Sequence, residues 1–281
     1  MESSKIYGLI GYPIKHSFSP AMHNAAFRAL DINAEYKLFE VPPGDLGSFI
    51  QQLQSTNICG LNVTVPHKEK VINFIELDEG SFHLKCIKAV NTIINEGGVW
   101  RGLNTDISGF ERALQEHYEP AQKKVALLGA GGAARAVSYV LARCGAKEIA
   151  VYDIDHQKSK NVTAMIKTLF SAVTIYPVPS LDKLDITHKD ILINATPIGL
   201  AQSDPLPVPE EMLGPHLFVY DLIYNPPQTK LLTSAKKAGA PYANGLGMLL
   251  YQGVLSFEHF TKKQAPLEVM REALMKELEE L

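Results

Sequence analysis

The chain has 281 residues, of which 46% are hydrophobic and 20% charged, with a formal net charge of −3 at pH 7. This is the composition of an ordinary globular protein, long enough for two domains. The small negative charge without a basic block argues against a nucleic-acid partner, and no apolar run approaches the roughly 20 residues of a membrane span. The N-terminus lacks a signal-peptide pattern, and three widely spaced cysteines fit neither a disulfide framework nor a zinc site. We therefore expect a cytoplasmic protein with no nucleic-acid, membrane or metal partner.

The N-terminal part of the chain predicts alternating strands and helices. Ser19 and Pro20 are a typical N-cap and first residue of a helix. The Gly97-Gly98 pair predicts a hairpin turn between two short strands. We expect strands at 5–11, 36–41, 58–65, 90–94 and 99–103, and helices at 20–30, 46–53, 68–75 and 107–117.

Two serines precede the first predicted helix. Ser17 and Ser19 are two apart in an extended segment, so their hydroxyls point the same way, beside the helix N-terminus. This arrangement suits a carboxylate ligand. Ser19 would cap the helix in any case, whereas Ser17 has no such local explanation.

Polar residues also mark the end of the strand at 58–65. Asn62 and Thr64 share one face of this otherwise apolar strand, so they need protein partners or they face a ligand. Lys68 follows the strand end, where functional groups gather in α/β proteins. An isolated lysine would be a surface charge, but its neighbours favour a functional role.

Asn91 and Asp106 lie close to the predicted hairpin. Asn91 is either a strand-end residue or a functional amide. Asp106 is either the N-cap of the helix at 107–117 or a functional carboxylate. The local pattern leaves both alternatives open.

A glycine-rich segment follows an apolar run at 125–128. Gly129, Gly131 and Ala134 have the G-x-G-x-x-A spacing, and a helical pattern comes next. Gly129 permits a tight turn, Gly131 allows a pyrophosphate to approach the backbone, and the small Ala134 lets helix and strand pack. A second apolar run ends at Asp153, where a carboxylate can bind the hydroxyls of an adenosine ribose. The segment predicts a dinucleotide site.

The remainder of the chain continues the α/β pattern. Strands are expected at 125–128, 149–152, 174–176, 191–194 and 218–222, in parallel βαβ units, with loops in the proline-rich stretch 177–215. Apolar residues from Leu267 to Leu281 recur at helical spacing and predict an amphipathic helix that packs on the protein body. We expect two α/β domains with a cleft between them. Their boundaries are 1–108 for a substrate-binding and catalytic domain, 109–244 for a Rossmann-type dinucleotide-binding domain, and 245–281 for C-terminal helices that pack on the first domain.

Eight motifs together resemble the shikimate dehydrogenase family, in the family's order and over nearly the whole chain. They are Ser17-Phe-Ser19, Asn62-Val-Thr-Val-Pro-His-Lys68, Ala89-Val-Asn-Thr92, Asn104-Thr-Asp106, Gly129–Ala134, Asn194-Ala-Thr-Pro-Ile-Gly199, Asp221-Leu-Ile-Tyr-Asn-Pro226 and Asn244-Gly-Leu-Gly-Met-Leu-Leu-Tyr-Gln252.

The resemblance implies reversible reduction of 3-dehydroshikimate to shikimate by a nicotinamide cofactor, with Lys68 and Asp106 as the catalytic pair. It implies that the substrate is held by Ser17, Ser19, Asn62, Thr64, Lys68, Asn91, Asp106, Tyr224 and Gln252. The cofactor residues would be Gly129, Ala130, Gly131, Gly132, Ala133 and Asp153, with Thr196, Leu222, Gly245 and Met248 near the nicotinamide end.

The chemistry of the residues agrees with this assignment. A ketone that accepts hydride needs a proton donor or an electrophile at its oxygen. No Cys/His set suits zinc, and no tyrosine is followed four residues later by lysine, as in short-chain dehydrogenases. Lys68 is the remaining donor, with Asp106 to orient it.

Two positions depart from the family pattern. The family's usual Asn-Arg-Thr, whose arginine binds the 2′-phosphate of NADP, is Asp153-Ile154-Asp155 here. A carboxylate favours the free ribose diol of NAD, so NAD is the expected cofactor and NADP the alternative. The family's glycine before Ala-Val-Asn is Lys88, a change for which the sequence offers no physical account.

Two alternatives for the function remain open at this point. Quinate is an alternative second substrate, since it carries the same carboxylate and an extra hydroxyl. A non-catalytic sensor of shikimate-type ligands is another, which the presence of both Lys68 and Asp106 disfavours. The protein is expected as a monomer or a homodimer.

Overall fold

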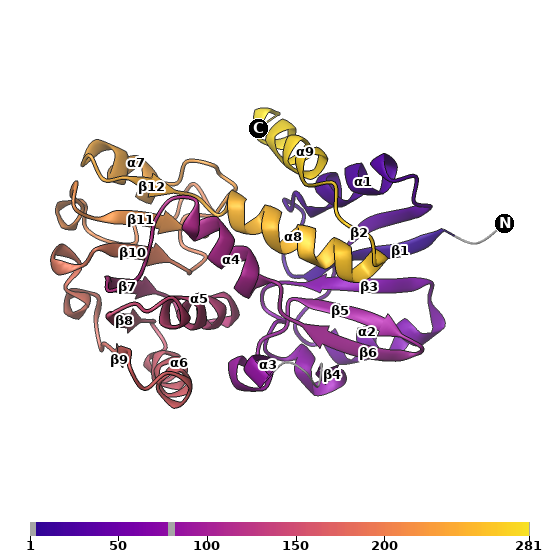
Figure 1. Ribbon diagram of the computed structural model, residues 1–281, viewed down its shortest axis with the longest axis horizontal. Coiled ribbons are helices and arrows are strands. Elements are labelled where there is room, and N and C mark those ends of the chain that lie inside the picture. The colour runs from indigo at the N-terminus through magenta and orange to yellow at the C-terminus, as the bar shows by residue number, and fades with distance from the viewer. Residues whose placement is uncertain (1–3, 78–81, 281) are drawn as a thin grey trace. The chain divides into compact units, whose positions relative to one another are not determined.

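The computed structural model describes residues 4–77 and 82–280. The chain divides into two compact units, each with its own six-stranded sheet (Figure 1). The first unit contains the described residues up to Gly109 and those from Leu250 onward, and the second contains Phe110–Leu249. The prediction of two α/β units is confirmed.

The sheet of the first unit has the strand order β2-β1-β3-β5-β6-β4. Strand β1 pairs in parallel with β2 and β3, whereas β5 pairs antiparallel with β3 and with β6. The predicted hairpin is therefore present, and Gly97 and Gly98 in its turn both have positive φ. The strands are β1 (Lys5–Gly11), β2 (Ala34–Glu40), β3 (Ile58–Val63), β4 (Glu76–Leu77), β5 (Thr92–Glu96) and β6 (Val99–Leu103).

Helices of the first unit come from both ends of the chain. They are α1 (Ser19–Ala29), α2 (Leu46–Gln52), α3 (Phe82–Ile87) and α9 (Leu267–Glu279), joined by parts of α4 (Asp106–Gln115) and α8 (Leu246–Thr261). Helix α9 lies beside α1 (Figure 1). Met270 and Leu274 of the predicted apolar stripe are buried, so α9 packs on the protein body as expected, while Leu281 lies outside the described residues.

The sheet of the second unit is entirely parallel, with the order β12-β11-β10-β7-β8-β9. Its strands are β7 (Lys124–Leu128), β8 (Glu148–Tyr152), β9 (Thr174–Pro177), β10 (Ile191–Asn194), β11 (Phe218–Asp221) and β12 (Tyr242–Ala243). Helices α5 (Gly132–Arg143), α6 (His156–Leu169) and α7 (Lys230–Lys237) connect them. The reversal of strand order between β7 and β10 creates the switch point where doubly wound sheets bind ligands.

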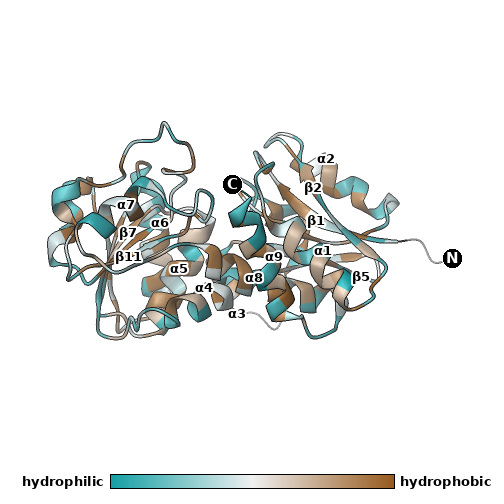
Figure 2. Cartoon of the chain, turned by 90° about the horizontal axis from the view of Figure 1, so that it is seen from above, coloured by the Kyte–Doolittle hydropathy of each residue, from teal (hydrophilic) through white to brown (hydrophobic). Residues whose placement is uncertain are grey.

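Each unit has a separate apolar core. In the first, Ile10, Leu61 and Val63 belong to a buried cluster with side chains of α2. In the second, Leu128, Leu192 and Val219 from three adjacent strands belong to another. Figure 2 shows hydrophobic colour along strands of both sheets and along much of α8. No helix in the described part of the chain has the length and hydropathy of a membrane span.

Two local predictions were wrong. The segment 68–75 contains only a 3-10 turn at Val71–Phe74, and it ends at Ile75, whose backbone is already extended toward β4. Helix α1 begins at Ser19 rather than Pro20, and its N-cap is Phe18, without a side-chain cap. Three 3-10 turns, at Leu181–Leu184, Ile186–His188 and Glu210–Met212, occupy the proline-rich stretch that was expected to form loops.

Candidate active site

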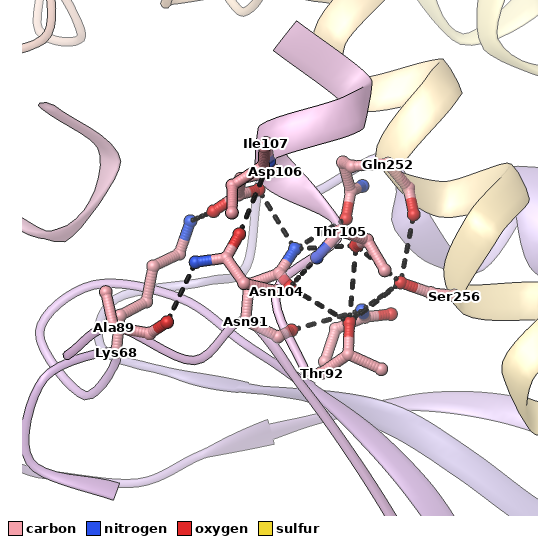
Figure 3. Close-up of polar contacts among 11 residues, drawn as sticks. Lys68, Ala89, Asn91, Thr92, Asn104, Thr105, Asp106, Ile107, Gln252 and Ser256 are labelled. Atoms are coloured by element: carbon pink, nitrogen blue, oxygen red, sulfur yellow. Dashed lines mark hydrogen bonds and ion pairs between the residues drawn. The ribbon is translucent and has the colours of Figure 1, made fainter. Parts of the chain in front are cut away.

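Lys68 and Asp106 form an ion pair in the first unit. Nζ of Lys68 lies 2.7 Å from Oδ2 of Asp106. The carboxylate is almost completely buried, with 3% of the residue exposed, whereas Lys68 is partly accessible. The structure thus brings together the two residues predicted as the catalytic pair, from segments 38 residues apart (Figure 3).

Asn104, rather than Asp106, caps helix α4. The Oδ1 of Asn104 accepts a hydrogen bond from the backbone N–H of Ile107 at 3.3 Å, and its Nδ2 donates to the carbonyl of Ala89 at 2.8 Å. The alternative that Asp106 serves only as a helix cap is therefore wrong. Because Asn104 takes this role, the Asp106 carboxylate is available for Lys68.

Asn91 supplies the second hydrogen bond to Asp106. Its Nδ2 donates to Oδ1 of Asp106 at 2.9 Å and to Oγ1 of Thr105 at 2.8 Å. Its Oδ1 accepts from the backbone N–H of Thr105 at 2.7 Å. Since a backbone N–H can only donate, this contact fixes which end of the amide faces Asp106. Both carboxylate oxygens are therefore acceptors, one for an amide and one for an ammonium group.

Gln252 reaches the same cluster from helix α8. Its Oε1 lies 3.3 Å from Nδ2 of Asn91, and the residue is 9% exposed. Figure 3 shows that the side chains of this cluster come from α8, from the start of α4 and from the hairpin region. Such a group of oriented donors and acceptors around a lysine can bind a polyhydroxylated ring and move a proton to or from one of its oxygens.

Asn62 is next to this cluster, and both ends of its side-chain amide bond to protein groups. Its Oδ1 accepts from the hydroxyl of Tyr36 at 2.8 Å. Its Nδ2 lies within hydrogen-bond distance of Oγ of Ser256 at 2.8 Å, Oγ1 of Thr92 at 3.0 Å and the carbonyl of Asn91 at 3.2 Å. Asn62 thus helps to hold Asn91 in place, through the bond to its carbonyl.

Three hydroxyl residues of this supporting layer were not predicted. Thr92, Thr105 and Ser256 lie within 3.3 Å of one another through their side-chain oxygens, and all three are buried. Ser256 was recognisable in principle, because it is a small polar residue one helical turn after Gln252, on the same face of the helix.

Ser17 and Ser19 bond to each other at the start of α1. Their hydroxyl oxygens are 3.2 Å apart, and Oγ of Ser17 accepts from the backbone N–H of Ser19 at 3.3 Å. The prediction that Ser19 caps the helix was wrong, because the helix begins at Ser19 itself. Ser17, which had no local explanation in the sequence, makes the backbone contact instead. Thr64 lies just beyond the end of β3, where its N–H donates to the carbonyl of Ile10 at 2.9 Å.

Lys88 adopts a left-handed backbone conformation, with φ of +50°. This conformation is strained for a side chain with Cβ and free of strain for glycine. The structure therefore gives a physical reason for the glycine that the family resemblance implies at this position. The strained residue lies three positions before Asn91.

The glycine-rich segment forms the turn between β7 and α5 in the second unit. Gly129 has φ of +95°, and a Cβ there would lie 2.8 Å from the carbonyl oxygen of Ala195. A Cβ on Gly131 would meet no atom within 4 Å, so the backbone is open to a ligand at this point. Helix α5 begins at Gly132, so the N–H groups of Gly132 and Ala133 lie in its first turn, where they lack intrahelical acceptors. This geometry can hold a pyrophosphate.

Asp153 follows β8, beside the glycine-rich turn. Its Oδ2 accepts from the backbone N–H of Ala130 at 2.7 Å, and its Oδ1 accepts from that of Asp155 at 2.8 Å. Asp155 itself caps α6 by accepting from the N–H of Gln157. Between them, Ile154 is 95% exposed. Each oxygen of Asp153 keeps a further acceptor position for a ribose hydroxyl.

Four more predicted cofactor residues follow strands β10, β11 and β12, which lie on the opposite side of β7 from β8 in the strand order. Thr196 follows β10, Leu222 follows β11, and Gly245 and Met248 lie before and within the first turn of α8. Tyr224, predicted to contact substrate, lies in the loop after β11 and so belongs to the second unit. The described residues contain no cluster of three or more His, Cys, Asp or Glu side chains suited to a metal ion.

Comparison with known proteins identifies relatives along the whole chain. Residues 9–93 match the shikimate dehydrogenase substrate binding domain, and residues 245–275 match the shikimate 5'-dehydrogenase C-terminal domain. The chain is 44% identical to a protein of Desulforamulus reducens and 42% identical to one of Methanopyrus kandleri, both named shikimate dehydrogenase (NADP(+)). Each alignment covers 98% of this chain and 96% of the relative.

A solved structure shares the fold. The shikimate 5-dehydrogenase of Listeria monocytogenes, crystallised with shikimate and NAD, superposes with a TM-score of 0.83 at 33% identity. The match covers 98% of this chain and 97% of the Listeria chain. The chain therefore belongs to the shikimate dehydrogenase family.

Proposed function

We propose that the protein catalyses the reversible reduction of 3-dehydroshikimate to shikimate with a nicotinamide dinucleotide. The observation that carries this proposal is the Lys68–Asp106 pair, whose carboxylate is also held by Asn91. When bound, the reduced cofactor supplies a hydride to the carbonyl carbon of the substrate. The Nζ of Lys68 donates a proton to the carbonyl oxygen, which becomes the hydroxyl of shikimate, and the reverse reaction returns both.

The other residues of the first unit would bind and orient the ring. Ser17 and Ser19 present hydroxyls at the N-terminus of α1, which suits the substrate carboxylate. Thr64, Asn91 and Gln252 would offer donors and acceptors for ring hydroxyls, and Tyr224 would be a further substrate-binding residue. Asn62 would act through Asn91, because its amide is already bonded to Tyr36 and to the supporting hydroxyls.

The experiment that tests this function is a turnover assay of the purified protein. Shikimate and quinate are each offered with NAD⁺ and with NADP⁺, and reduced cofactor is followed by its absorbance. Oxidation of shikimate with at least one cofactor supports the proposal. Failure with all four combinations would overturn it, and efficient quinate oxidation would extend the substrate range to quinate.

We further propose that NAD is preferred over NADP. The support is Asp153, whose carboxylate is fixed at the end of β8 by the N–H groups of Ala130 and Asp155. A 2′-phosphate at this point would meet a like charge, and the nearby His156 and Lys158 only partly offset it. The exposed Ile154 can lie against an adenine ring but cannot bind a phosphate. The relatives of Desulforamulus reducens and Methanopyrus kandleri are named as NADP(+) enzymes, so a preference for NAD would distinguish this protein from them.

The two units would bind different ligands. The first, with the Lys68 cluster, would bind substrate, and the second, with the glycine-rich turn, would bind the dinucleotide. The protein would act in the cytoplasm as a monomer or a homodimer, and size-exclusion chromatography with light scattering distinguishes these two states.

A further inference from the structure

Two polar side chains are buried where strands β10 and β11 end. Asn194 and Asp221 are both 0% exposed, and Nδ2 of Asn194 donates to Oδ1 of Asp221 at 3.0 Å. Each is the last residue of its strand, and the two strands are neighbours in the parallel sheet. The proposed reaction requires neither side chain to touch a substrate.

Asn194 holds the loop that follows β10. Its Oδ1 accepts from the backbone N–H of Thr196 at 3.1 Å and from the Thr196 hydroxyl at 2.7 Å. Its Nδ2 also donates to the carbonyl of Ile198 at 3.1 Å. Because the Thr196 N–H can only donate, the orientation of the amide is fixed, with Nδ2 toward Asp221. All four hydrogen-bonding positions of the Asn194 amide are therefore used.

Asp221 holds the loop that follows β11. Its Oδ1 also accepts from the backbone N–H of Ile223 at 3.1 Å, and its Oδ2 accepts from the hydroxyl of Thr229 at 2.7 Å. Burial raises the pKa of this carboxyl to about 6, although the three donors favour the ionised form. Burying a carboxylate costs free energy that an apolar residue would not cost, so its use here points to a need for a defined loop geometry.

The two loops also interlock with the segment before α8. The N–H of Leu222 donates to the carbonyl of Asn194 at 2.9 Å, and the N–H of Gly245 donates to the carbonyl of Ile223 at 3.1 Å. A Cβ on Gly245 would overlap the carbonyl group of Leu222, so only glycine allows this approach. Three segments distant in the sequence thus share one rigid hydrogen-bonded arrangement.

The position of these loops in the sheet indicates what they receive. Strands β10, β11 and β12 lie on one side of β7, whereas β8, with Asp153, lies on the other. In a doubly wound sheet the two halves each bind one half of a dinucleotide, outside the carboxyl ends of the strands. Since Asp153 and the glycine-rich turn suit the adenosine half and the pyrophosphate, the β10–β12 side is left for the nicotinamide half.

We propose that Asn194, Asp221 and Thr229 are positioning residues that fix the loops after β10 and β11 in the shape that receives the nicotinamide half of the cofactor. This inference rests on the proposed function. The set of three side chains, called here the buried clamp, acts through Thr196, Leu222 and Gly245. It predicts that loss of the clamp weakens binding of the nicotinamide half and leaves binding of the adenosine half intact.

Direct binding measurements without turnover test the clamp. Dissociation constants of NADH and of ADP-ribose, which lacks nicotinamide, are measured by calorimetry for the wild type, Asp221→Ala, Thr229→Val and Thr229→Ser. NADPH and 2′-phospho-ADP-ribose form a second matched pair. Thr229→Ser keeps the hydroxyl and is the conservative control. Circular dichroism and thermal unfolding check that each variant is folded.

We expect Asp221→Ala and Thr229→Val to weaken the binding of the reduced dinucleotide by about 10-fold or more, the effect of losing a hydrogen bond to a buried charge. Binding of ADP-ribose should change less than about 2-fold, and Thr229→Ser should bind both ligands like the wild type. If Asp221→Ala does not fold, the Thr229 pair decides. Thr229 also caps α7 through the N–H of Leu232, but loss of that cap alone would not separate the two ligands.

Two results would overturn the clamp while leaving the proposed function in place. One is an equal loss of affinity for dinucleotide and ADP-ribose, and the other is unchanged affinity for both. A wild type that binds none of the four nucleotides would overturn the proposed function and the clamp together.

Discussion

The side-chain amide of Asn91 donates to Oδ1 of Asp106 from 2.9 Å, on the carboxylate oxygen opposite the one that Lys68 contacts. The backbone N–H of Thr105 donates to Oδ1 of Asn91, and this contact fixes the orientation of the amide. The carboxylate therefore has one oxygen for a neutral donor and one for the ammonium group, and Lys68 is held in one place at the edge of the cluster. A lysine held in this way can exchange a proton with an oxygen atom placed beside it.

Lys68→Ala should abolish most of the chemistry while substrate still binds. We expect kcat to fall by about 10²-fold or more, as for the loss of a general acid or base. Steady-state kinetics give kcat, and calorimetry with shikimate gives the dissociation constant. Lys70→Ala, which removes an exposed lysine two residues away, is the matched control and should keep wild-type kcat. A Lys68→Ala variant with near-normal kcat would remove Lys68 from the mechanism.

The cofactor preference should depend on Asp153. We expect kcat/KM for NAD to exceed that for NADP by about 10-fold or more, since a like-charge clash of about 1.4 kcal/mol gives this ratio. The double change Asp153→Ser with Ile154→Arg should shift the preference toward NADP, because it removes the carboxylate and adds a guanidinium group. Initial rates at saturating shikimate, with each cofactor varied, provide both values.

The control for this prediction is Asp182→Ser, which makes the same Asp-to-Ser change at an exposed position of the second unit. It should leave the NAD to NADP ratio unchanged. Equal efficiency with the two cofactors in the unmodified protein, or a preference for NADP, would show that Asp153 does not bind the ribose in the way proposed.

Lys88→Gly should be tolerated and Lys88→Val should not. Lys88 has φ of +50°, which costs a residue with Cβ roughly 1–2 kcal/mol. Glycine relieves this strain but loses about 0.5–1 kcal/mol of backbone entropy, so the free energy of unfolding should rise slightly or stay constant. Valine, being β-branched, should lower it by more than about 1 kcal/mol. Urea unfolding followed by circular dichroism measures all three proteins, and a glycine variant less stable than the valine variant would contradict the backbone explanation.

His23 should make the protein less stable in acid. The residue is 0% exposed, stacks on the ring of Tyr36 at a centroid distance of 4.3 Å, and has no partner for either ring nitrogen among the residues that the structure describes. Burial lowers its pKa from 6.5 to about 3, so the unfolded chain binds a proton more readily than the folded protein between these values. The contribution of neutral His23 to the free energy of unfolding is therefore present above about pH 6.5 and is lost as the pH falls toward 3. Between pH 7 and pH 5, protonation of His23 in the unfolded chain should lower the free energy of unfolding by about 2 kcal/mol.

A comparison with His23→Phe isolates this effect. Both proteins are unfolded with urea at pH 7 and at pH 5, and the loss of unfolding free energy on acidification is compared. Other titrating groups contribute equally to both proteins, so the wild type should lose about 2 kcal/mol more than the variant. An equal loss in both would show that His23 is not the acid-sensitive group.

Much of the fold could be predicted from the sequence because its signals are local. Short apolar runs bounded by turn residues depend only on near neighbours, and they located β1, the β5–β6 hairpin and strands β7 to β11, whereas the two-residue strands β4 and β12 were missed. The turn at Gly129 was predictable for the same reason, since its need for positive φ follows from the spacing of small residues after an apolar run. Polar side chains at strand ends likewise pointed to Lys68, Asn91 and Asp106, which the structure brings together.

The partner of each polar atom was decided only by the tertiary structure. Asn104 rather than Asp106 caps α4, and Asn62 bonds to Tyr36 and Ser256 from segments far away in the sequence. The left-handed conformation of Lys88 and the buried pairing of Asn194 with Asp221 likewise became visible only in three dimensions. The physical reason is that a side-chain hydrogen bond depends on sheet register and helix packing, which bring distant residues within about 3 Å, whereas the sequence pattern specifies only which face of an element a residue occupies.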